Sequence, residues 1–104
     1  MSFDIDQVIK DMVAAVTGSA KEGGNAVKTE AERILFAEKH ILMDIAEARL
    51  RGEIDDEVVK REAAREKKVL EAELLTLAVM TKATVQRAAN AALDVFFAAL
   101  RSAI

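Results

Sequence analysis

The sequence contains no cysteine, tryptophan, tyrosine or proline, and His40 is its only histidine. Without cysteine, the chain cannot form disulfides, thiolate nucleophiles or zinc sites built from thiolates. Covalent catalysis also lacks a basis, because no nucleophile lies close to His40 in the sequence. We therefore predict that the protein is not an enzyme, and we expect no catalytic residue and no cofactor.

The chain also lacks an excess of basic charge. Its 104 residues include 15 Lys and Arg against 18 Asp and Glu, for a net charge of −3. Binding to nucleic acid through a basic face is therefore not expected. Charged residues interrupt the apolar C-terminal third, so no membrane span is predicted. The first residues do not resemble a signal peptide, and the expected location is cytoplasmic.

Helix formers dominate the composition. The chain has twenty alanines, and glycine occurs only at positions 18, 23, 24 and 52. This composition predicts an all-α fold. A chain of this length buries only about two thirds of its unfolded surface, so we expect one domain with one core, or one core shared between chains.

The first predicted helix covers about residues 3–17, followed by a glycine-rich joint at residues 18–25. Its apolar residues recur at spacings of three and four, which places them on one helical face: Ile5, Val8, Ile9, Met12, Val13 and Val16. The residues of the joint are small, polar or glycine, which predicts a flexible segment, and Asn25 is a suitable N-cap for the next helix.

The second predicted helix covers about residues 26–51 and ends in a tight turn. Its apolar residues span more than half of its circumference, so we expect it to contact more than one neighbour. Gly52 suits the left-handed position that ends a helix, and Asp55 can cap the helix that follows. Ile54 and Val59 have the spacing of a hydrophobic staple. Together these features predict a helical hairpin.

No glycine or proline follows Asp56, so residues 55–103 are predicted to form one helix. Its 48 residues from Asp56 onward would be about 72 Å long. The alternative is a kink or break near residues 81–84, because the β-branched residues there weaken the helical tendency: Val79, Thr81, Thr84 and Val85. Such a break would give four helices in place of three.

An antiparallel hairpin centred on residues 52–54 would place residue i near residue 106 − i. This pairing brings Arg33 to Glu73, Glu38 to Lys67 or Lys68, and His40 to Glu66. Residues 1–25 carry four acidic and two basic groups, whereas residues 74–104 carry one acidic and three basic groups. The opposite net charges favour contact between the N-terminal and C-terminal helices.

The apolar faces of both long helices are wider than a single hairpin can cover. We therefore predict an antiparallel hairpin with an additional N-terminal helix, assembling into a four-helix or larger bundle. The expected function is a non-enzymatic structural, scaffold or adaptor component whose partner is a second copy, with another protein as a further option. The predicted interface residues are Ile34, Phe36, Ile41, Met43, Leu74, Leu77, Phe96 and Phe97.

Two other functions remain open. One is a carboxylate-rich metal-binding bundle, because His40, Asp44 and Glu47 share a helical face; it predicts that His40, Glu47 and Glu66 converge. Glu38, Glu66 and Glu73 fall in or beside apolar stripes, where they could be ion-paired or could line a cation site. The other is partner docking by an amphipathic helix at residues 83–104, through Val85, Ala89, Ala92, Phe96, Phe97 and Leu100.

Overall fold

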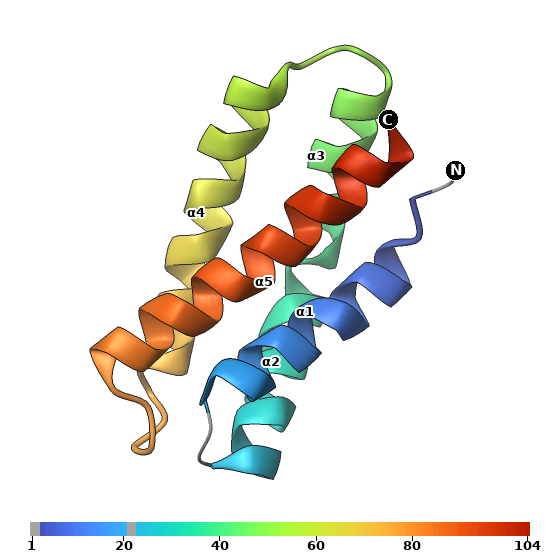
Figure 1. Ribbon diagram of the computed structural model, residues 1–104. Helices are drawn as coiled ribbons and strands as arrows, with labels where there is room; N and C mark the ends of the chain where they lie inside the picture. Colours follow the sequence, from blue (N-terminus) through green and yellow to red (C-terminus); the bar gives the residue numbers. More distant parts are fainter. Residues whose placement is uncertain (1–2, 21–22) are drawn as a thin grey trace.

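The computed structural model describes residues 3–20 and 23–104, and these residues form helices and no strand. The helices are α1 (Ile5–Ala20), α2 (Gly24–Ala37), α3 (Lys39–Leu50), α4 (Asp56–Leu74) and α5 (Lys82–Ala103) (Figure 1). The all-α prediction is confirmed. None of the described helices is long and apolar enough to cross a membrane.

α1 packs mainly against α5, and the two helices run in opposite directions (Figure 1). α1 begins at Ile5 because Asp4 Oδ1 accepts the backbone N–H groups of Asp6 and Gln7, at 3.1 and 3.3 Å. Both helices bury apolar residues, and the small ones on α5 allow close approach of the two helices: Ile9, Met12 and Val16 on α1, and Ala88, Ala89 and Ala92 on α5. The predicted contact between the N-terminal and C-terminal helices is confirmed.

α2 and α3 form one helical arm with an irregularity at Glu38. The backbone hydrogen bonds continue through it, from Glu38 N–H to Ile34 O and from Leu42 N–H to Glu38 O, each 3.1 Å long. The predicted helix over residues 26–51 is therefore present as two segments. Its predicted start was wrong, because Gly23, at φ 79°, precedes the first turn and Asn25 lies inside α2.

The turn between α3 and α4 has the predicted local structure. Gly52 is left-handed at φ 76°. Its N–H bonds Arg49 O, while Glu53 N–H bonds Ala48 O, which is the Schellman pattern. Asp55 caps α4 by accepting the N–H of Val58 at 3.0 Å. Arg49 crosses the turn to Asp56 at 2.9 Å and lowers the pKa of that carboxyl.

The single helix predicted over residues 55–103 is absent, because the chain reverses between Leu74 and Lys82 (Figure 1). Thr81 has extended backbone at φ −87° and ψ 161°, and its hydroxyl caps α5 by accepting the N–H of Thr84 at 3.2 Å. Met80 is buried in the core, which anchors the reversal. The molecule measures 41 × 22 × 19 Å, far shorter than a continuous helix would be.

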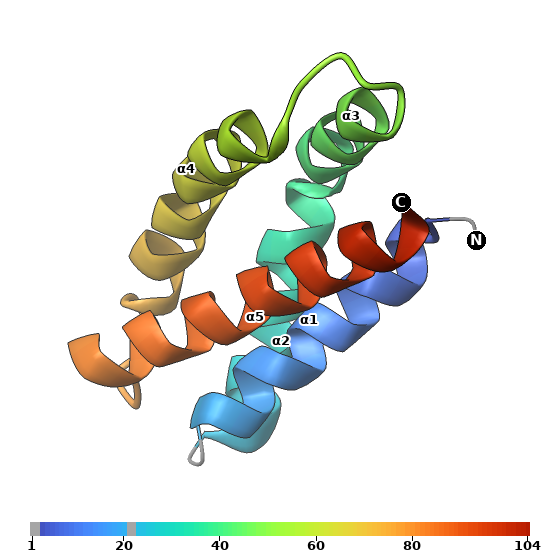
Figure 2. The same ribbon diagram turned by 45° about the horizontal axis from the view of Figure 1, so that its top comes forward.

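The reversal gives the molecule four helical arms around one core. α1 packs on α5 and α2, and α4 packs on α5 and on the α2–α3 arm (Figure 2). Much of the wide apolar faces is consequently covered within a single chain, while Phe36, Ile41 and Leu50 on the α2–α3 arm remain exposed. This finding narrows the argument from surplus apolar width, which led to the prediction of self-association, to that arm.

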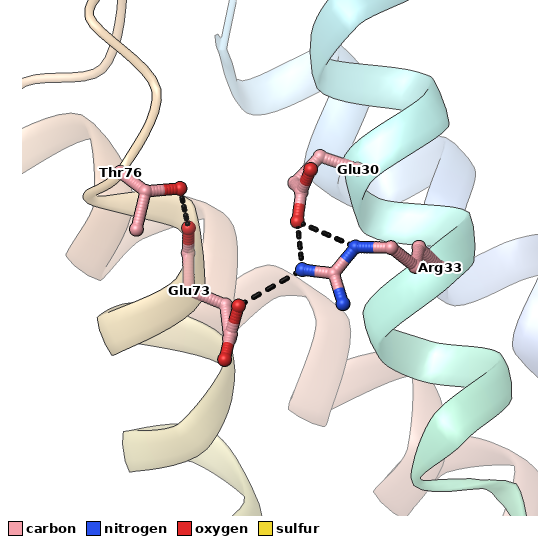
Figure 3. A network of polar contacts seen from close by, with 4 residues as sticks. All are labelled: Glu30, Arg33, Glu73 and Thr76. Carbon is pink, nitrogen blue, oxygen red and sulfur yellow. Dashed lines mark hydrogen bonds and ion pairs between the residues drawn. The ribbon is translucent and has the colours of Figure 1, made fainter.

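Arg33 on α2 links this arm to α4. Its guanidinium donates to Glu73 Oε2 at 2.9 Å and also pairs with Glu30, while the Thr76 hydroxyl donates to the backbone carbonyl of Glu73 (Figure 3). The hydrogen bonds to Glu30 and Glu73 raise the pKa of Arg33. The predicted pairing of residue 33 with residue 73 is therefore confirmed.

Candidate functional site

A groove of about 620 Å³ lies between α1 and α2. It is mostly apolar with charged groups among its lining residues: Lys10, Val13, Ala14, Thr17 and Gly18 from α1, and Lys28, Glu32 and Phe36 from α2. Its volume falls within the range of natural ligand sites, about 300–1,000 Å³. We call this feature the α1–α2 groove.

Helix periodicity builds the two walls. Lys10, Val13, Ala14 and Thr17 follow the spacing i, i+3, i+4, i+7, so they form one patch on α1. On α2, Lys28, Glu32 and Phe36 are four residues apart. Val13 is buried at the floor, whereas Phe36 leaves 47% of its surface exposed.

Gly18 leaves one end of the groove bare. A Cβ at this position would meet no atom within 4 Å, so packing within the chain does not require glycine here. Glycine in a helix costs roughly 1 kcal/mol relative to alanine. The bare backbone therefore offers room for close approach from outside the chain.

The structure divides the predicted interface residues. Ile34, Leu74 and Phe96 are at most 2% exposed within one chain, so they are not available at its surface in this fold. The chain reversal contributes to this burial, because it packs α5 against α4 and along α1. Met43, Leu77 and Phe97 are half-buried. Phe36 and Ile41, at 47% and 45%, are exposed.

The C-terminal docking face is also covered. α5 has the predicted amphipathic pattern, but Val85, Ala89, Ala92, Phe96 and Leu100 are buried against the rest of the chain. Phe96 packs edge-on against Phe3, with ring centroids 6.0 Å apart. These five side chains are therefore not free at the surface of this fold, whereas Phe97 is half-buried.

The residues of the metal hypothesis do not converge. His40 and Asp44 are exposed on α3, and Glu47 pairs with Arg51 at 2.8 Å. Across residues 3–20 and 23–104, no group of three or more histidine or acidic side chains could hold a metal ion. The predicted meeting of His40, Glu47 and Glu66 is thus not found in the described part of the chain.

The Glu66 carboxyl lies beside that of Glu38, whereas the pairing predicted from the sequence placed Glu38 near Lys67 or Lys68. Burial of the Glu66 carboxyl, its hydrogen bond with Glu38 and the repulsion from Glu38 and Glu62 together raise the pKa of Glu66 to about 7. Oε2 of Glu66 is buried without a hydrogen-bond partner among the described residues. Burial and the neighbouring Glu38 thus favour the protonated form of Glu66, between the α2–α3 junction and α4.

Sequence reasoning missed the α1–α2 groove. A signal was available, because Ala14 and Gly18 are small residues beside the apolar stripe of α1. It could not be interpreted before the direction of α2 was known. Compared with models of protein families, with curated proteins and with solved structures, the chain matches none.

Proposed function

We propose that this protein is a non-enzymatic helical module of the scaffold or adaptor type, which binds a helix of another protein in the α1–α2 groove. The observation that carries the proposal is the patch formed by Lys10, Val13, Ala14 and Thr17. Four residues at i, i+3, i+4 and i+7 form the hole that receives one side chain of a packed helix. Ala14 at its centre is exposed and small.

The exposed ring of Phe36 adds an energetic reason for docking. Full burial of a phenylalanine side chain contributes about 1.5–3 kcal/mol, so covering its exposed half contributes roughly 1 kcal/mol. Along both walls the lining residues span nine positions, which is a rise of about 12 Å along the helix. This length matches a partner helix of two to three turns, which makes a small interface of modest affinity.

The test uses the purified chain and an uncharged helical peptide of roughly 12 residues, held helical by a covalent staple on its outer face. The peptide carries leucine on its inner face and glutamine elsewhere. Amide NMR spectra should show shifts at Val13, Ala14 and Thr17 as the peptide is added.

Two matched variants complete this test. Ala14→Glu should abolish the shifts, because it fills the hole with a charge, whereas Ala98→Glu should leave them unchanged. Both alanines are exposed on helices, so neither variant should unfold the protein. A peptide that shifts no resonance of the groove, or equally strong binding by Ala14→Glu, would overturn the proposal.

Self-association is a second candidate function, because an apolar stripe remains along the α2–α3 arm. Phe36, Met43 and Leu50 recur every seven residues, and Phe36 and Leu50 are 47% and 40% exposed. Light scattering over a concentration series should then show a dimer that Leu50→Gln weakens and Leu75→Gln does not. Leu75 is a suitable control because it is 48% exposed just beyond α4. A monomer at every concentration would contradict this candidate.

A further inference from the structure

The α1–α2 groove carries three charges in a fixed order. α1 and α2 run in opposite directions (Figure 1), so Lys10 lies toward the Phe36 end and Lys28 toward the Gly18 end. Glu32 lies between them, one turn beyond Lys28 on α2. Read along the groove, the charges are positive, negative, positive. None of the three makes an ion pair within the part of the chain that the structure describes.

This order opposes pairing of the groove with a second copy of itself. The sequence of charges reads the same from either end. A two-fold axis through Glu32 would set Glu32 against Glu32 and lysine against lysine, and an axis displaced toward one lysine would pair that lysine with Glu32 but leave the other lysine of each copy unpaired. Like charges brought together at an interface disfavour that partner, and the groove consequently calls for a different chain.

Resting on the function proposed above, we propose that the α1–α2 groove binds an amphipathic helix of a different protein. This helix carries an acidic, a basic and an acidic residue at i, i+4 and i+8 beside its apolar anchors. Eight residues of helix rise about 12 Å, the same distance as Lys10 to Gly18 along α1 or Lys28 to Phe36 along α2. The order of the partner's charges is then complementary to the order of Lys10, Glu32 and Lys28 along the groove.

A small anionic amphiphile fits these groups less well. Its single head group would neutralise one lysine, while its hydrocarbon tail would lie against the Glu32 carboxylate. A helix of mixed charge satisfies all three groups at once. The lining charges sum to +1 in a chain whose net charge is −3, so two acidic groups and one basic group on the partner complement them.

The experiment compares two charged forms of the stapled peptide described above, with the same leucine anchors. One carries Glu, Lys and Glu at the three positions, and the other carries Lys, Glu and Lys. NMR titration of the whole chain should show about tenfold tighter binding of the Glu-Lys-Glu peptide. That preference should shrink as salt is raised, because the groups are exposed.

Charge reversal in the protein provides the decisive variant. The triple change Lys10→Glu, Glu32→Lys and Lys28→Glu should invert the preference between the two peptides. Lys68→Glu, on the exposed surface of α4, changes the net charge equally and should leave the preference intact.

The outcomes separate this inference from the function on which it rests. Equal binding of both charged peptides in the groove would overturn the charge pattern and leave helix binding standing. Failure of all peptides, the uncharged one included, would overturn both. Binding of dodecanoate that displaces the Glu-Lys-Glu peptide and exceeds its affinity would assign the groove to an amphiphile and overturn the inference.

Discussion

Gly23, just before α2, lies against Val79 in the α4–α5 reversal, so closely that a Cβ on Gly23 would come within 2.6 Å of Val79 Cγ2. The contact joins two connections that are far apart in the sequence. Gly23 is also left-handed, at φ 79°. Glycine is therefore required here both by backbone conformation and by space.

Gly23→Ala should accordingly destabilise the protein by about 2 kcal/mol or more, from an unfavourable φ and a steric clash. Gly52→Ala should cost only about 1 kcal/mol, because Gly52 has a similar φ but open space around it. Urea denaturation measures both values. Adding Val79→Ala should recover part of the loss at position 23 and none at position 52, and equal losses in the two single variants would contradict the contact.

Gly18→Ala should stabilise the protein by about 0.5–1 kcal/mol. Position 18 is helical, a Cβ there meets nothing within 4 Å, and alanine is the better helix former. The measurement is the midpoint of urea unfolding at constant slope. A loss of stability would mean that position 18 is tighter than the structure shows.

Phe96→Ala should cost about 3–5 kcal/mol, because the ring is fully buried and its removal leaves a cavity between α1 and α5. Phe36→Ala should change stability by less than about 0.5 kcal/mol, since the ring lines a surface groove. Thermal and urea unfolding of the two variants make the comparison. A small effect at position 96 would contradict a core closed within one chain.

The contribution of Glu66 to the free energy of unfolding should fall as the pH rises from about 4.5 to about 7. In this window the folded chain keeps the Glu66 proton, because its pKa is raised to about 7, while the unfolded chain, with a pKa near 4.5, releases it. Glu66→Gln should remove this dependence. It should make the protein more stable than wild type at pH 8, by about 1 kcal/mol after allowance for solvent screening of a partly exposed carboxyl.

Urea unfolding at pH 5 and pH 8 tests this prediction for wild type, Glu66→Gln and Glu53→Gln. Glu53 is exposed in the α3–α4 turn and serves as the control, with a pH dependence like that of wild type. Glu66→Gln with the wild-type pH dependence would show that Glu66 does not retain its proton in the folded chain.

Local signals in the sequence were sufficient to predict the α3–α4 turn and the cap of α4. Gly52 and Asp55 define the α3–α4 turn through backbone conformation and capping, which depend on neighbouring residues alone. The pairing of Arg33 with Glu73 followed from the position of that turn. A break near residues 81–84 was the alternative to one continuous helix, and the chain does reverse between Leu74 and Lys82. Local signals did not decide between the two, because the burial of Met80 in the reversal depends on the whole fold.

The α1–α2 groove lay beyond sequence reasoning for a similar reason. Periodicity assigned Val13 to an apolar face, but it could not show that α2 leaves part of that face open. Phe36 was predicted as an interface residue from its place on a broad apolar helix, and only the path of the chain shows that it stays at the surface while Phe96 does not.

The contact between α1 and α5 also determines the order of events during synthesis. A ribosome makes α1 and its neighbour α2 well before α5, so the apolar face of α1 lacks its principal partner until α5 has emerged. Until then the nascent chain carries a partly exposed apolar face on α1, a state that favours aggregation or chaperone binding. Its core closes only when α5 joins α1.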